Sequence, residues 1–153
     1  MLNKSTLKKL ALCHFLLLFC AFPSLSLAQD FVVLVNAENT ISGSDDELKL
    51  EVKRLFLQQK KRWNSGLDAA PLAPLEDSDA YDAFLNQVLK MEKNQLEQFW
   101  RKARQKSGTT PTRPVRSDRL AIRLVEKKAG GFAVISTEST FDLPENTRIL
   151  FAF

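Results

Sequence analysis

Three carboxylates just before a predicted helix are the residues of this chain whose types and spacing come nearest to catalytic chemistry. Glu76, Asp77 and Asp79 lie within a single short segment. Paired carboxylates can carry out general acid–base catalysis, but one of them must then be buried with a shifted pKa. A segment this polar predicts exposed side chains. We therefore interpret the acids as helix caps and solvated surface, and predict no catalytic residue.

The positions of histidine and cysteine exclude most other site chemistry. His14 is the single histidine, and the two cysteines are Cys13 and Cys20. Residues 29–153 therefore cannot build a Ser-His or Cys-His nucleophilic site, a usual zinc site or a haem site. They also cannot form a disulfide. We predict a protein that is not an enzyme and that holds no metal and no cofactor.

The first 28 residues have the three-part layout of a secretory signal peptide. Three lysines precede the apolar run 10–22, and small residues occupy the third and first positions before a predicted cleavage after Ala28. The apolar run is too short to span a bilayer comfortably. We predict a signal peptide over 1–28, one domain over 29–153, a periplasmic location and no stable membrane span after processing.

The elements that must position any site alternate between strands and helices. This alternation predicts an α/β domain with a mixed sheet and helices on both faces. The apolar run 31–35 predicts a central strand buried on both faces. Prolines restrict 69–75 to an edge or irregular strand. Further elements are predicted as helices from about 45 to 58, from Asp77 or Ser78, from Asn94 and from Ser117, and as strands over 132–136 and 148–153.

Side-chain patterns refine the helices. Asn94 with Glu97 predicts a capping pair, and Gly130-Gly131 predicts a left-handed helix stop. Trp63 and Trp100 are predicted to belong to the core rather than to stack on a ligand. The residues predicted to face inward on the fourth helix are Leu120, Ala121, Leu124 and Val125.

Five landmarks resemble, in order, those of the phosphate ABC transporter substrate-binding family. They are the helix and turn 51–66, Phe84 with Val88-Leu89, Gln95-Leu96 with Phe99-Trp100, Ser107-Gly108 with Pro111, and the turn 130–134. The resemblance covers about residues 31–153. It implies a type II periplasmic-binding-protein-like fold, of which residues 29–153 supply material for a single lobe. It also implies a solute-binding protein for phosphate or a similar small oxyanion, linked to ABC-type uptake.

The family's phosphate-binding segment falls at residues 74–80, where this chain departs from the pattern. Ser78 matches a phosphate-binding hydroxyl, but Pro74 stands where the family has arginine, and Asp79-Ala80 replaces a Gly-Thr pair. Carboxylates at this helix start favour the helix dipole but repel a phosphate dianion. Ser78 is nevertheless a predicted ligand-binding residue.

The loop after the first strand supplies the other predicted ligand-binding residues. Asn39, Thr40 and Ser42 follow the carboxyl end of that strand, as does Asn36, and ligands of open α/β sheets bind at such ends. Amides and hydroxyls are also ordinary turn formers, so the alternative of a purely structural loop stays open.

The charge pattern supports a different function. Residues 101–128 contain ten Lys or Arg against Asp118 and Glu126, whereas 29–100 is net acidic. The alternative hypothesis is a non-catalytic envelope interaction module that keeps the fold, has lost the ligand site and docks on an envelope protein through 101–128. Arg113, Arg116 and Arg119 could also gather a small anion, and two solvated basic helices would give the same pattern. Nucleic-acid binding is disfavoured, because residues 29–153 are near neutral and export removes them from the cytoplasm.

Overall fold

The computed structural model describes residues 30–153, so the predicted signal peptide lies outside the described residues. The strands are β1 (Phe31–Asn36), β2 (Ala70–Pro71), β3 (Gly131–Ser136) and β4 (Thr147–Ala152). The α-helices are α2 (Asp45–Phe56), α3 (Asp79–Ala83), α4 (Lys93–Ser107) and α5 (Asp118–Glu126). A π-helical segment η1 (Phe84–Leu89) continues α3, and a short 3-10 turn η2 (Thr137–Thr140) follows β3.

The four strands form one mixed sheet in the order β2-β3-β1-β4. β1 is antiparallel to both of its neighbours, whereas β2 and β3 run parallel. The predicted central position of the first strand and the edge position of the proline-containing strand are both confirmed. An edge strand tolerates Pro71 because one side of it needs no backbone donor.

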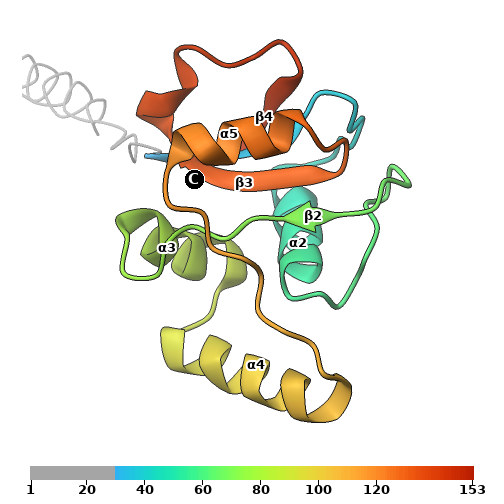
Figure 1. Cartoon of the computed structure of the whole chain (residues 1–153), viewed down its shortest axis with the longest axis vertical. Helices are drawn as coiled ribbons and strands as arrows, with labels where there is room; N and C mark the ends of the chain where they lie inside the picture. Colours follow the sequence, from blue (N-terminus) through green and yellow to red (C-terminus); the bar gives the residue numbers. More distant parts are fainter. Residues whose placement is uncertain (1–29) are drawn as a thin grey trace, which may run out of the picture.

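The two faces of the sheet are covered by different helices (Figure 1). Alternate residues of β1 divide between them: Val33 and Val35 pack with α2, α3, η1 and α4, whereas Val32 and Leu34 pack with α5. The run 31–35 therefore lacks polar alternation because both faces of the strand are buried. The predicted mixed sheet with helices on both faces is confirmed.

Local capping explains where most helices begin. Glu47 accepts hydrogen bonds from the backbone nitrogen and the hydroxyl of Ser44 at the start of α2. The prediction for α4 was wrong by two positions, because the helix is capped by Glu92 with Gln95 and Asn94 lies inside its first turn. An Asn-x-x-Glu pair and a Glu-x-x-Gln pair overlap here, and the second is the one that caps the helix.

Gly130 and Gly131 do not form the predicted left-handed stop. Positive φ angles among the described glycines occur at Gly66 and Gly108. Gly130 is required by close approach instead, since a Cβ there would lie 1.8 Å from the carbonyl oxygen of Asp68. The inward face of α5 also needs correction: Ala121 and Val125 are buried, Leu124 is partly buried, and Leu120 is exposed.

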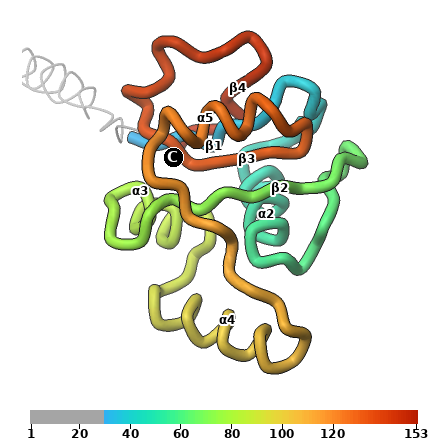
Figure 2. Tube along the Cα trace, viewed as in Figure 1, coloured from blue at the N-terminus to red at the C-terminus, as the bar shows by residue number. Residues whose placement is uncertain are grey.

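A long connection, here called the strap (residues 108–117), returns the chain from α4 to α5 (Figure 2). It is held by hydrogen bonds on both sides of Ala73, to Arg113 and Val115, and by the Thr112 hydroxyl, which donates to the Phe56 carbonyl. The strap is therefore a fixed wall beside α4. No helix among residues 30–153 is long and apolar enough to cross a membrane.

Candidate ligand site

Ser78 lies at the start of α3 in a tightly fixed turn. Its hydroxyl oxygen accepts from the Tyr81 nitrogen at 3.2 Å and donates to the Leu75 carbonyl at 2.7 Å. Asp77 before it has a φ of 66°, a left-handed conformation that asparagine and aspartate tolerate better than most residues. Ser78, one of the two residues predicted for the helix start, therefore caps α3 and presents its oxygen at the amino end of the helix.

The start of α5 lies close to this turn. Ser117 caps the helix by accepting from the Leu120 nitrogen at 3.3 Å. The Asp118 carboxylate accepts from the Ser136 nitrogen at 2.8 Å and from the Ser139 hydroxyl at 2.7 Å. These bonds tie α5 to the carboxyl end of β3, so the negative charge of Asp118 is partly offset by two donors.

A cavity of about 130 Å³ joins the two helix starts. It is lined by Ser78 with Pro74 and Leu75 on one side, by Arg116, Ser117 and Asp118 on another, and by Ala133 and Val134 of β3. It lies beyond the carboxyl end of β2, at the edge where ligands of parallel strand pairs bind. We call it the helix-start cavity.

The charges around the helix-start cavity oppose one another. The amino ends of helices carry unpaired N–H groups and a partial positive charge. Among the described residues, no ion pair or side-chain hydrogen bond involves Arg116. Glu76, Asp77 and Asp79 add negative charge, although Asp77 pairs with Lys93 at 2.6 Å. This bond, with the charge of Asp77, raises the pKa of Lys93. The chemistry suits a weakly held anion rather than a tightly gripped one.

The predicted loop residues lie at the opposite end of the strands from the carboxyl end of β3. β1 is antiparallel to β3, so its carboxyl end points away from that of β3. The Asn36 amide nitrogen donates to the carbonyls of Val125 and Glu126, at the carboxyl end of α5. The helix-start cavity lies at the amino end of α5. The structure therefore does not bring Asn39, Thr40 and Ser42 together with Ser78.

The contacts of this loop are structural. The Asn39 side chain is completely buried, and its oxygen accepts from the Ile41 nitrogen and the Ser65 hydroxyl. The Arg148 guanidinium donates to the carbonyls of Asn39 and Ile41. The side-chain nitrogen of Asn39 is buried and makes no hydrogen bond in the described chain. Thr40 and Ser42 are exposed, so a ligand role for this loop stays a prediction.

The three arginines that the sequence suggested as an anion site do not line a common cavity. Arg113, Arg116 and Arg119 line three different cavities, and only Arg116 lies at a helix start together with Ser78. Sequence inspection did not pair Ser78 with Arg116, because 37 intervening residues conceal the proximity. Both tryptophans are buried, as predicted. Residues 30–153 contain no cluster of three or more His, Cys, Asp or Glu that could hold a metal ion.

Comparison with known proteins shows the fold. No protein-family model matches the sequence, and a search of curated proteins finds no relative. The structure is similar to an ABC-type phosphate transport receptor from Vibrio cholerae (15% identity, TM-score 0.56, 79% of this chain and 45% of that chain). It is similar to PstS from Borrelia burgdorferi (14%, TM-score 0.58, 79% and 46%).

A third solved structure extends the likeness. It is described as a putative phosphate ABC transporter substrate-binding protein with bound phosphate from Clostridium perfringens (12% identity, TM-score 0.51, 80% of this chain and 54% of that chain). The chain thus spans about half the length of the solved structures that it matches. The predicted periplasmic-binding-protein-like fold is confirmed.

Proposed function

We propose that this chain is a periplasmic solute-binding-like protein for a small oxyanion, with phosphate as the first candidate and a role in ABC-type uptake. The helix-start cavity is the observation that carries the proposal. It combines two helix amino ends with the unpaired Arg116 guanidinium, and Ser78 lines it. Backbone N–H groups and a guanidinium are the donors that recognise oxyanions in proteins.

The proposal includes export and the absence of catalysis. Two parts of the proposal, the signal peptide over 1–28 and the binding domain over 29–153, rest on the sequence. The similar solved structures are described as transport receptors and substrate-binding proteins, which supports binding rather than turnover. Because the described lobe leaves its cavity open to water, the ligand is held by screened interactions and binds weakly.

Calorimetric titration with phosphate and then sulfate, at low and moderate salt, tests the proposal. Arg116→Gln should weaken saturable binding about tenfold, because it removes one charge-assisted hydrogen bond. Ser78→Asp should abolish it while keeping a residue that caps helices well. Arg119→Gln is the matched control, since Arg119 lines a different cavity. If the folded protein shows no heat of binding up to millimolar phosphate or sulfate, the proposal is refuted.

The same titration decides the role of the predicted loop. If Thr40→Ala or Ser42→Ala weakens phosphate binding while Arg116→Gln leaves it unchanged, the ligand lies at the carboxyl end of β1 and the helix-start cavity is the wrong site. Unchanged binding in both loop variants would limit the ligand residues to Ser78 and its neighbours.

The envelope interaction module is the second candidate function. Its supporting observation is that none of the described ion pairs involves a Lys or Arg of 101–128. Because no carboxylate neutralises them, unpaired basic side chains produce a positive electrostatic potential that attracts an acidic partner. This candidate predicts no small-ligand heat and a partner contact in envelope extracts that weakens as salt rises from about 50 to 300 mM.

A further inference from the structure

A second and larger cavity is lined by an earlier part of the strap, residues 111–114, whereas the helix-start cavity is lined by residues 115–117. It has a volume of about 510 Å³ and lies between α4, the strap and the start of α3. We call it the α4 groove. Its apolar lining comes from Phe56, Tyr81, Leu96 and Trp100, which are all buried. A volume of a few hundred Å³ with an apolar lining is typical of sites for small organic ligands.

Two hydrogen-bond donors in the α4 groove have no acceptor. Tyr81 is 7% exposed and Trp100 is 8% exposed, yet within residues 30–153 neither the Tyr81 hydroxyl nor the Trp100 indole nitrogen makes a hydrogen bond. Buried tyrosine and tryptophan usually find a partner for these groups. Neither atom is sealed from solvent, since the side-chain nitrogen of Asn39 is the buried atom without a partner in the described chain. Both donors therefore keep some exposure to solvent, and both belong to residues that line the groove.

Burial contributes to the donor character of Tyr81. Burial, followed by the charge of Glu76, raises the pKa of Tyr81. A phenol is protonated at neutral pH even at its ordinary pKa, and a raised pKa keeps the Tyr81 hydroxyl a donor. The other tryptophan differs, because the Trp63 indole nitrogen donates to the Gly130 carbonyl at 2.9 Å.

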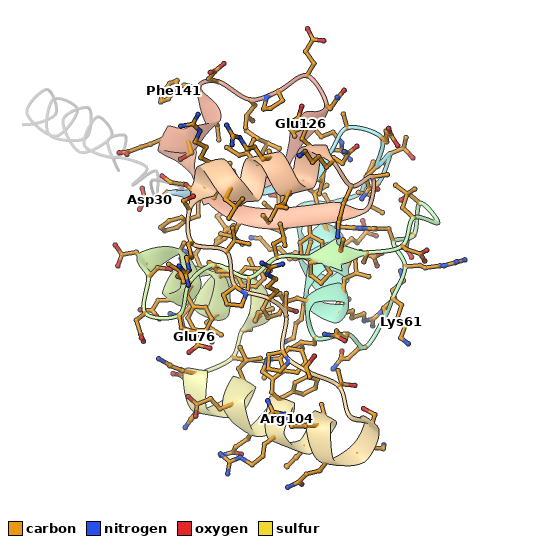
Figure 3. All side chains as sticks on the ribbon, viewed as in Figure 1. Asp30, Lys61, Glu76, Arg104, Glu126 and Phe141 are labelled. Atoms are coloured by element: carbon orange, nitrogen blue, oxygen red, sulfur yellow. The ribbon has the colours of Figure 1, made fainter. Side chains whose placement is uncertain are left out.

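The rim of the α4 groove is rich in unpaired positive charge. Arg101 and Arg104 come from α4 and Arg113 comes from the strap; all three are exposed, and no described ion pair includes them. Two acids, Glu76 and Glu97, also line the groove. Figure 3 places Glu76 beside α3 and Arg104 on α4. The three guanidinium groups outnumber the two carboxylates, so the rim favours an anion.

The walls of the α4 groove are fixed by the strap. The Ala73 nitrogen donates to the Arg113 carbonyl at 3.0 Å, and the Val115 nitrogen donates to the Ala73 carbonyl at 2.9 Å. Ala73 and Pro74 line both cavities, and this backbone pairing runs between them. A ligand of the groove therefore need not enter the helix-start cavity, and the two sites can be tested separately.

We propose that the α4 groove is a second ligand site, which binds an organic anion with a flat apolar body, such as an aryl carboxylate. The apolar body lies against the aromatic lining, where planar groups pack favourably with Trp100 and Tyr81. The carboxylate accepts hydrogen bonds from the rim guanidinium groups, whose planar fork matches its two oxygens. The unpaired phenol and indole donors favour a ligand that carries acceptors.

Titration with 2-naphthoate tests the site. The full chain is expressed, and the protein that accumulates is purified and titrated. We expect saturable binding with a dissociation constant of about 1 mM or tighter. The uncharged 2-naphthamide and the non-aromatic acetate should bind much more weakly, because each lacks one half of the recognised chemistry. In ¹H–¹⁵N spectra the Trp100 indole resonance should shift, and that of Trp63 should not.

Variants separate the α4 groove from unspecific charge. Arg104→Gln should weaken 2-naphthoate about tenfold, and Tyr81→Phe about fivefold. Lys102→Gln removes one positive charge from the same helix but does not line the groove, so it should leave the affinity unchanged. Phosphate should not compete with 2-naphthoate. Absence of binding, equal binding of the amide, or equal weakening by Lys102→Gln would overturn the proposal.

Discussion

Replacing Gly130 by alanine should be one of the most damaging small substitutions in this protein. The new Cβ would lie 1.8 Å from the oxygen and 2.8 Å from the carbon of the Asp68 carbonyl. Both atoms belong to the backbone, so no side-chain rotation relieves the overlap. The start of β3 and the segment before β2 must move apart by more than 1 Å to restore ordinary contact.

The magnitude follows from what this movement breaks. The Gly130 carbonyl accepts from the Ala70 nitrogen and from the Trp63 indole nitrogen, each at 2.9 Å. Losing two such bonds costs about 2 kcal/mol, and overpacking of a closely packed site costs about 1–3 kcal/mol more. We expect Gly130→Ala to lower the free energy of unfolding by about 3–5 kcal/mol, a large share of the about 5–15 kcal/mol typical of a domain.

Urea unfolding followed by tryptophan fluorescence measures this effect, because Trp63 lies at the affected contact. Gly43→Ala is the matched control: its Cβ meets a Glu47 carboxylate oxygen at 3.2 Å, which must move by only a few tenths of an ångström. Because this oxygen also caps α2 at Ser44, the change should stay within about 1 kcal/mol. Gly130→Asn provides the refuting test. Asparagine tolerates left-handed backbone, so an Asn variant clearly more stable than the Ala variant would show that a left-handed conformation, and not close approach, requires glycine.

Three further predictions concern contacts that position the fold. Asn36→Ala should lower the free energy of unfolding by about 2–3 kcal/mol, because one buried and one partly buried hydrogen bond to the end of α5 are lost; an unfolding midpoint in urea equal to that of the wild type would contradict this. Ser117→Ala should cost about 1 kcal/mol and Ser117→Asp much less; equal losses would show that capping of α5 is unimportant. Hydrogen bonds from the backbone and then the hydroxyl of Ser44 lower the pKa of Glu47, so its stabilising contribution is present above the unfolded-state pKa and is lost as pH falls through the lower folded-state pKa. Glu47→Gln should therefore flatten the acid side of the stability profile measured by urea unfolding from pH 7 to 3, and curves parallel to wild type would refute this assignment.

Short-range patterns predicted most of the elements. The run 31–35 lacks polar residues because β1 is buried on both faces, and the spacing of Tyr81, Phe84, Leu85, Val88 and Leu89 matches the buried face of α3 and η1. These signals depend on residues a few positions apart, so they can be recognised in a single sequence. The α4 start was missed because two capping pairs overlap within six residues, and α2 ends two residues early, where Gln58 turns left-handed with a φ of 54°.

The sequence by itself determined the absence of His and Cys chemistry beyond residue 20, the α/β pattern, and helix starts near residues 45, 78 and 117. Only the tertiary structure decided which of these residues meet. It made β1 antiparallel to β3 and thereby moved Asn39, Thr40 and Ser42 away from Ser78. It also brought Arg116 to Ser78, and Tyr81 to Trp100 beneath the strap. The physical reason is that strand direction and strap position depend on contacts between residues tens of positions apart, whereas capping and periodicity act within a few residues.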